Sequence, residues 1–324
     1  MVEPTGPRIE ANTHPQPHAA IVGGGIMGCD IAAIFAAGGW QVHVMSPSQA
    51  TRDTLPVRLR KTLAGLDADP ALADQVQAWE RLEDVPWPQV DIVIEAATED
   101  LALKQRLFAQ LDTLARPDIP LASNTSSYPI GEIGKDLKTR ARVVGLHFFM
   151  PAHLVPLVEV VSAEFTDPAV AERAQAVMQS LGKETISVRK DLPGFVANRL
   201  QHALMREALW LVANGAATPE DVDKAVRYGF GFRFLACGPM LQKEMSGWDT
   251  NYRSGSMIYP SLCNDSRPPD MFRDMVAQGH TGMKTGHGLW QWDENSIRQE
   301  KARYEHMLRQ AFLLLTGESE STPP

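Results

Sequence analysis

The chain has 324 residues, 44% hydrophobic and 22% charged, a balance typical of a globular protein large enough for two domains. Its formal net charge of −8 argues against nucleic acid or an anionic membrane surface as a partner. The three cysteines lack metal-ligand spacing, and neither a secretory segment nor a run long enough to span a membrane is seen, so we expect a cytoplasmic protein without a metal site.

Residues 1–17 are polar and contain prolines, and we expect them to form a loose tail. A short apolar strand follows, then Gly23, Gly25 and Gly28 in G-x-G-x-x-G spacing, an apolar helix and a second strand over 41–45. Strand, glycine loop, helix and strand within about thirty residues form the opening βαβ unit of a dinucleotide-binding fold. The cofactor phosphates would lie at the amino end of the helix.

The rest of the chain divides into two compositional parts. Residues 48–84 are expected to form one or two short helices broken by Pro56, Gly65 and Pro70. Further strands are predicted over 90–96, 121–123, 142–148, 157–161 and 184–188, alternating with helices over 101–114, 130–137 and 167–181. After residue 190 we predict only helices, including 194–214, 219–228 and 294–315. The pattern therefore predicts a doubly wound, mostly parallel sheet over 18–189 and an all-α domain over 190–324.

Ser46 departs from the usual NAD pattern, because an acidic residue normally ends the second strand and binds the ribose 2′-hydroxyl. A serine would not repel a 2′-phosphate, so NADP stays open beside NAD. Arg52 could approach such a phosphate, although a solvated arginine at a helix start is the simpler interpretation.

Polar side chains follow several of the predicted strands, in the segments SNTSS (123–127), GLHFFMP (145–151), LVPLVEVV (154–161) and PGFVANR (193–199). The carboxyl ends of the strands are where such sheets bind ligands. A histidine can take the proton of an alcohol as its hydride leaves, and a carboxylate on its second ring nitrogen fixes the tautomer.

These segments, with KTGHGLWQW at 284–292, resemble the L-3-hydroxyacyl-CoA dehydrogenase family over residues 18–293. The resemblance implies His147 as the catalytic base, Glu159 as its partner carboxylate, and Ser126 and Asn198 as substrate-binding residues. It also implies contacts to the cofactor from Gly23, Gly25, Ile26, Met27, Gly28, Ser46, Glu99, Lys104 and Asn124. Without the resemblance, Glu99 fits a solvated acid at a helix start and Lys104 a surface lysine.

Two departures from the family bear on the substrate. Met150 stands where the family usually has asparagine, and the stretch from Ser46 to Val90 is shorter than the basic helical hairpin that helps family members hold CoA. Met150 removes one polar contact near the substrate, and the shorter stretch favours a small, CoA-free substrate, as in relatives that oxidise free hydroxy acids, carnitine, gulonate or a pyridine carboxylate. A true acyl-CoA enzyme and a non-catalytic, crystallin-like protein are the alternatives. The decarboxylating β-hydroxyacid dehydrogenases fit less well, because His147 and Glu159 would have no role there.

Two expectations concern the second domain. Its aromatic residues and methionines exceed what one small helical domain can bury, so we expect a homodimer, as the resemblance also implies. A substrate carboxylate needs a cation, and Arg233 in GFGFRF is our candidate, ahead of Lys243 and Arg253. A structural ion pair is the alternative for Arg233.

Overall fold

The computed structural model describes residues 16–317, which form two compact units that divide between Val196 and Ala197. The predicted tail therefore lies almost entirely outside the described residues. The division falls a short way after the predicted boundary at 189, because Phe195 is buried in the core of the first unit and the Val196 amide donates to Glu159 of that unit.

The first unit contains an eight-stranded sheet of order β3-β2-β1-β4-β5-β6-β7-β8. The strands are β1 (His18–Val22), β2 (Gln41–Met45), β3 (Gln77–Trp79), β4 (Ile92–Glu95), β5 (Leu121–Ser123), β6 (Val143–Phe148), β7 (Leu157–Val161) and β8 (Glu184–Val188). All neighbours pair in parallel except β6 and β7. The predicted doubly wound, mostly parallel sheet is confirmed.

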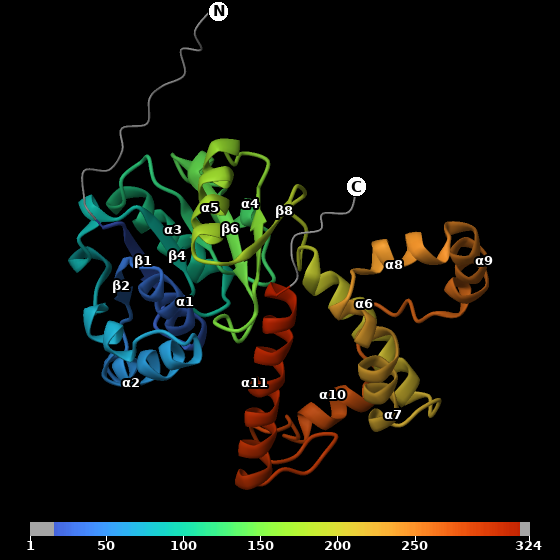
Figure 1. Ribbon diagram of the computed structural model, residues 1–324. Coiled ribbons are helices and arrows are strands. Elements are labelled where there is room, and N and C mark those ends of the chain that lie inside the picture. The colour runs from blue at the N-terminus through green and yellow to red at the C-terminus, as the bar shows by residue number, and fades with distance from the viewer. Residues whose placement is uncertain (1–15, 318–324) are drawn as a thin grey trace, which may run out of the picture. The chain divides into compact units, whose positions relative to one another are not determined.

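Helices cover the sheet, as Figure 1 shows for the first unit. They are α1 (Ile26–Ala37), α2 (Gln49–Gly65), α3 (Leu101–Leu114), α4 (Ile130–Gly134) and α5 (Pro168–Ser180). Short 3-10 turns complete this unit: η1 (Pro70–Gln75), η2 (Leu82–Asp84), η3 (Trp87–Gln89) and η4 (Arg140–Arg142). Neighbouring strand residues such as Ile21 and Val22 belong to two different hydrophobic clusters. Successive side chains of a strand point to opposite faces, so both faces of the sheet are covered.

The prediction that Pro56 breaks the helix after β2 was wrong. Helix α2 runs without interruption for 17 residues with Pro56 inside it, and the Ser48 side chain caps its amino end. Proline removes one hydrogen bond from a helix interior. Here Leu55, Leu59 and Leu63 form a buried stripe that packs into the core, and we attribute the survival of the helix to that packing.

The described part of the second unit contains helices and no strand, apart from isolated bridges at 282, 287 and 291. Its helices are α6 (Ala197–Ala213), α7 (Pro219–Lys224), the π-helix η5 (Ala225–Phe230), η6 (Gly231–Leu235), α8 (Pro239–Ser246), α9 (Trp248–Ile258), η7 (Tyr259–Ser261), α10 (Asp270–Ala277) and α11 (Glu294–Thr316). Phe272 is the only side chain buried among residues 197–317. No helix between residues 16 and 317 is long and apolar enough to cross a membrane.

The buried His43 of the sheet contacts two partly buried rings. The Trp79 indole N–H lies 3.3 Å from Nδ1 of His43, and Nε2 of His43 lies 3.1 Å from Nδ1 of His18. Burial and the nearby His18 lower the pKa of His43 to about 4. The unfolded chain takes up this proton as the pH falls below about 6.5, while folded His43 stays neutral until about pH 4.

We therefore expect the free energy of unfolding to fall by about 3 kcal/mol from this residue alone between pH 7 and pH 4. His43→Gln should remove that part of the loss in urea titrations at the two pH values. His306→Gln, on the exposed side of α11, is the matched control and should lose stability as the wild type does. Equal acid sensitivity of the wild type and His43→Gln would contradict the assignment.

Candidate functional site

The glycine loop between β1 and α1 leaves room for a dinucleotide. Gly23 has a φ of 116°, and a Cβ there would lie 2.5 Å from the carbonyl oxygen of Ala96. A Cβ on Gly28 would lie 1.7 Å from the carbonyl oxygen of Gly23, whereas Gly25 has open space around its Cβ position. The first and third glycines thus allow tight packing, and Gly25 leaves an open approach to the amino end of α1. These residues fit a cofactor pyrophosphate.

Arg58 of α2 is hydrogen-bonded to this loop, a contact that was not predicted from the sequence. Its guanidinium donates to the carbonyl oxygens of Gly24 at 2.8 Å and Gly25 at 3.2 Å. Ile26 is exposed at the start of α1, and Met27 packs partly against the core. Of these two predicted cofactor contacts, Ile26 is therefore the more accessible side chain.

Ser46 is buried at the end of β2 beside Arg52. The Arg52 guanidinium donates to the Ser46 carbonyl oxygen at 2.6 Å and pairs with Glu80 at 3.0 Å. Only 11% of the Arg52 side chain is exposed, so it is not the solvated arginine expected from the sequence. A 2′-phosphate here would have to compete with the Glu80 carboxylate for Arg52.

The expectation that Lys104 is a surface lysine was wrong. Lys104 is fully buried, and its ammonium lies 2.8 and 3.0 Å from the two carboxylate oxygens of Glu95, the last residue of β4. It also lies 3.2 Å from Glu99. The Glu95 carboxylate is completely buried as well, and a buried carboxylate requires a cation or several hydrogen bonds. Lys104 in α3, nine residues after Glu95 in the chain, supplies this cation.

Glu99 organises the loop after β5. Its carboxylate accepts hydrogen bonds from the Thr125 hydroxyl at 2.6 Å and from the amides of Ser126 and Ser127 at 3.3 and 3.1 Å. Partial burial raises the pKa of Glu99, but the Thr125 hydrogen bond and the Lys104 charge outweigh it and hold the pKa below its ordinary value. Glu99 is therefore an ionised anchor of the loop that carries Ser126, with 36% of its side chain exposed.

His147 and Glu159 form a buried pair on the two antiparallel strands. They are direct cross-strand neighbours in the register of β6 and β7, and Nδ1 of His147 lies 2.7 Å from Oε2 of Glu159. The second carboxylate oxygen accepts from the Val196 amide at 3.0 Å. The rings of Phe149 and Phe195 lie 4.5 and 5.5 Å from the imidazole. This packing holds Nδ1 of the imidazole on the carboxylate and so fixes the orientation of the ring.

The other predicted site residues lie in both units. The Asn124 side-chain oxygen accepts from the Phe148 amide at 2.8 Å, which links the end of β5 to the end of β6 beside His147. Ser126 follows on the same loop and is partly exposed. Asn198 lies at the start of α6 and Arg233 in η6, both in the second unit.

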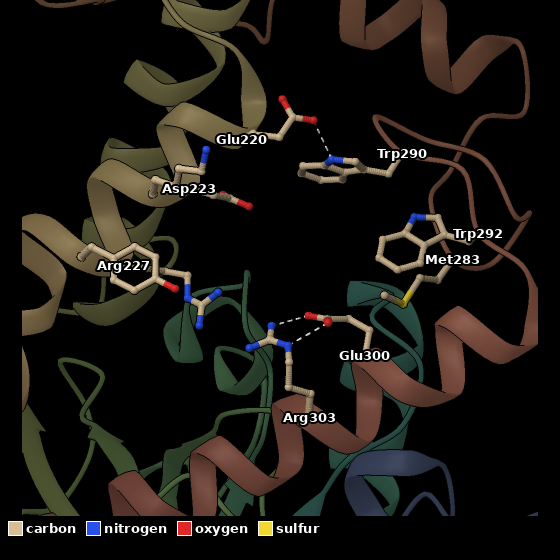
Figure 2. Close-up of a pocket in the computed structure, with 10 residues that line it drawn as sticks. Glu220, Asp223, Arg227, Met283, Trp290, Trp292, Glu300 and Arg303 are labelled. Carbon is tan, nitrogen blue, oxygen red and sulfur yellow. Dashed lines mark hydrogen bonds and ion pairs between the residues drawn. The ribbon is translucent and has the colours of Figure 1, made fainter.

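Two cavities lie in the second unit. One, of about 550 Å³, has Trp290 and Trp292 in its wall, as Figure 2 shows, and Trp290 donates to Glu220 at 2.9 Å. The other, of about 780 Å³, has Arg233 in a mostly apolar wall that includes Leu313. Among residues 16–317, Arg233 makes no ion pair, and no cluster of three metal-ligating side chains is found.

The buried ion pair of Lys104 can be tested against an exposed one. Lys104→Met leaves the buried Glu95 carboxylate without its cation, so we expect a loss of about 3–5 kcal/mol in the free energy of unfolding. Lys135→Met breaks the exposed pair with Glu132 and should stay close to the wild type in the same urea titration. Similar stabilities of the two variants would contradict a structural role for Lys104.

Comparison with known proteins gives family matches over both units. The family described as 3-hydroxyacyl-CoA dehydrogenase, NAD binding domain, matches residues 18–192, and the C-terminal domain of the same family matches residues 194–292. A 5-formyl-3-hydroxy-2-methylpyridine 4-carboxylate 5-dehydrogenase from Mesorhizobium japonicum is 31% identical, covering 88% of this chain and 94% of the relative. The solved structure of an enzyme so named, described as an NAD+-dependent dismutase, covers 94% of this chain and 100% of its own at 30% identity, with a TM-score of 0.88.

Two further relatives differ in the substrates that they are named for. An L-carnitine dehydrogenase from Streptomyces coelicolor is 38% identical, covering 70% of this chain and 73% of the relative. A 3-hydroxybutyryl-CoA dehydrogenase from Mycobacterium tuberculosis is 36% identical, covering 83% and 96%. The two domain matches, together with relatives that align over most of their length, show that this chain belongs to the 3-hydroxyacyl-CoA dehydrogenase family and is an NAD(P)-dependent dehydrogenase acting on hydroxyl groups.

Proposed function

We propose that this dehydrogenase oxidises an alcohol group of a small, CoA-free, carboxylate-bearing substrate, with His147 and Glu159 as its acid–base pair. The observation that carries the proposal is the 2.7 Å contact between the two side chains, buried in the unit that holds the glycine loop. A buried histidine held by a carboxylate is suited to take up a proton from a substrate and to return it.

In this mechanism, Nε2 of His147 accepts the hydroxyl proton as the carbonyl forms. Bound NAD+ supplies the acceptor for the hydride. The Glu159 carboxylate keeps the proton of Nδ1 facing itself and stabilises the positive charge that develops on the ring. The two neighbouring phenylalanine rings exclude water, which strengthens the interaction between imidazolium and carboxylate. In the reverse direction the same nitrogen returns the proton.

Ser126 and Asn198 are proposed to hold the substrate oxygen. Both are neutral hydrogen-bonding side chains, so they can bind an alcohol and a carbonyl equally well. The Ser126 loop is fastened by the Glu99 carboxylate, which supports a fixed position for its hydroxyl. Asn198 is carried into this role by the family motif alone.

Three observations support a CoA-free substrate. The interval between β2 and β4 contains one long helix, α2, with short 3-10 turns and strand β3 after it, rather than a helical hairpin. Two of the relatives are named for a pyridine carboxylate and for carnitine. Arg233 lines a cavity of the second unit and can bind a carboxylate. The alternative, a 3-hydroxyacyl-CoA substrate, is favoured by the relative named for 3-hydroxybutyryl-CoA.

The second unit is proposed to form a homodimer. Large apolar side chains are exposed along its helices, among them Leu200, Leu204, Trp248, Met257, Leu313 and Leu314. Exposed apolar patches of this kind mark protein interfaces, and among residues 197–317 only Phe272 is buried. We also propose that the protein is located in the cytoplasm.

NAD(H) is proposed as the cofactor in preference to NADP(H), since the Glu80 carboxylate already occupies Arg52. NADH should bind at least about tenfold more tightly than NADPH in competing fluorescence titrations, a difference of about 1.4 kcal/mol. Glu80→Gln should narrow this preference by freeing Arg52. Tighter binding of NADPH by the wild type would refute the choice.

The acid–base role predicts a specific defect. His147→Ala should lower kcat by about 10²–10⁴-fold, because a general base contributes that much, while NADH binding changes little. His306→Ala, on α11, should retain wild-type kcat. Reduced-cofactor absorbance, followed across a panel of hydroxy acids and 3-hydroxyacyl-CoAs, gives the measurement. A His147→Ala enzyme with more than about a tenth of wild-type kcat would contradict the assignment.

A further inference from the structure

The connection between β6 and β7, residues 149–156, is held by two buried charged side chains. The Asp30 carboxylate accepts from the Ala152 amide at 3.0 Å and lies 3.0 Å from Nδ1 of His153. The Lys183 ammonium donates to the carbonyl oxygens of Ala152 at 2.6 Å and Val155 at 3.0 Å. The amide and the carbonyl of Ala152 are thus each bound to a charged group.

Neither charge takes part in the proposed proton transfer. Asp30 belongs to α1 and Lys183 precedes β8, and they are only 5% and 8% exposed. Burial lowers the pKa of Lys183 to about 8, although the nearby Asp30 charge opposes the shift, so the ammonium form predominates at pH 7. Buried charges are costly, and here they hold a single connection.

That connection joins the two halves of the acid–base pair. His147 lies two residues before it on β6 and Glu159 three residues after it on β7. Phe149, the first residue of the connection, packs its ring 4.5 Å from that of His147. A displacement of the connection would therefore shift the imidazole and the carboxylate relative to each other.

We propose that Asp30 and Lys183 are positioning residues that hold the β6–β7 connection and thereby keep His147 aligned with Glu159; the catalytic consequence rests on the function proposed above. Asp30 follows Gly28 by two residues on the helix that begins at the glycine loop. Through this helix, Asp30 therefore links the glycine loop to the β6–β7 connection. The Thr62 hydroxyl of α2 donates to Oδ1 of Asp30 at 3.2 Å, whereas the connection is bound through Oδ2.

Three variants test the proposal. Asp30→Ala removes both contacts to the connection, and Lys183→Met removes the ammonium at similar side-chain length. Thr62→Val is the matched control, because it removes a buried hydrogen bond to Asp30 and leaves the connection bound. Asp30→Ala and Lys183→Met should lower kcat by about 10–100-fold, since small misplacements of catalytic groups have effects of that size. Thr62→Val should keep kcat within about twofold of the wild-type value. All three variants should bind NADH with an affinity within about twofold of that of the wild type.

A second readout is independent of activity. In ¹⁵N-histidine NMR spectra the Nδ1 proton of His147, bound to Glu159, should exchange with solvent about tenfold faster in Asp30→Ala and Lys183→Met than in the wild type and Thr62→Val. Wild-type exchange and kcat in both of the first two variants would overturn the proposal. If the wild type oxidises none of the tested alcohols, the proposed function fails, while the exchange rates still decide whether the two charges position His147. If one variant does not fold, the other decides.

Discussion

The contact between His147 and Glu159 depends on the one antiparallel pairing in the sheet. In the register of β6 and β7 the two residues lie directly opposite each other, and their side chains meet at 2.7 Å. Directly opposed residues of an antiparallel pair bring their Cβ atoms within about 5 Å. This pairing puts a histidine from the end of β6 beside a carboxylate from the middle of β7. The remaining strands present the cofactor loop at the edge where parallel strands end.

Buried charges support this edge of the sheet at several places. Lys104 neutralises Glu95 at the end of β4, while Glu99 fastens the loop that carries Ser126. Asp30 and Lys183 fasten the connection after β6. In each case a carboxylate or an ammonium binds loop backbone or another buried charge inside a low-dielectric interior, where such bonds are strong and leaving them unmade is costly. The edge is therefore rigid where the proposed chemistry requires fixed distances.

Much of the fold follows from sequence patterns, and the failures have physical causes. The strands β2, β5, β7 and β8 were predicted nearly to the residue, because apolar runs bounded by polar turns carry a strong signal. Strand β3 was missed because it is only three residues long and largely exposed. The continuity of α2 through Pro56 was also missed, since a local rule for proline takes no account of the buried leucines that stabilise the helix.

Some of the site residues were predicted from the sequence and others were missed. The spacing of His147 and Glu159 within a family motif led to the pair, and the structure brings the two together. Lys104 was misjudged because periodicity does not reveal that a charged side chain is buried; the glutamate ending the apolar strand VDIVIEA was the available signal. Asp30, Arg58 and Lys183 bind backbone groups distant in sequence, contacts that no local pattern encodes.

The most direct test of the account is the pH dependence of NADH formation in single turnovers by the wild type and by Glu159→Gln. It uses the best alcohol substrate from the panel of hydroxy acids and 3-hydroxyacyl-CoAs. If Glu159 orients and stabilises the His147 imidazolium, the wild-type rate should rise with pH to a plateau, as expected for a reaction that needs a free base. Glu159→Gln should lower that plateau by about 10²-fold or more while leaving NADH affinity unchanged. The same plateau and the same pH profile in both enzymes would contradict the claim that this pair carries the proton.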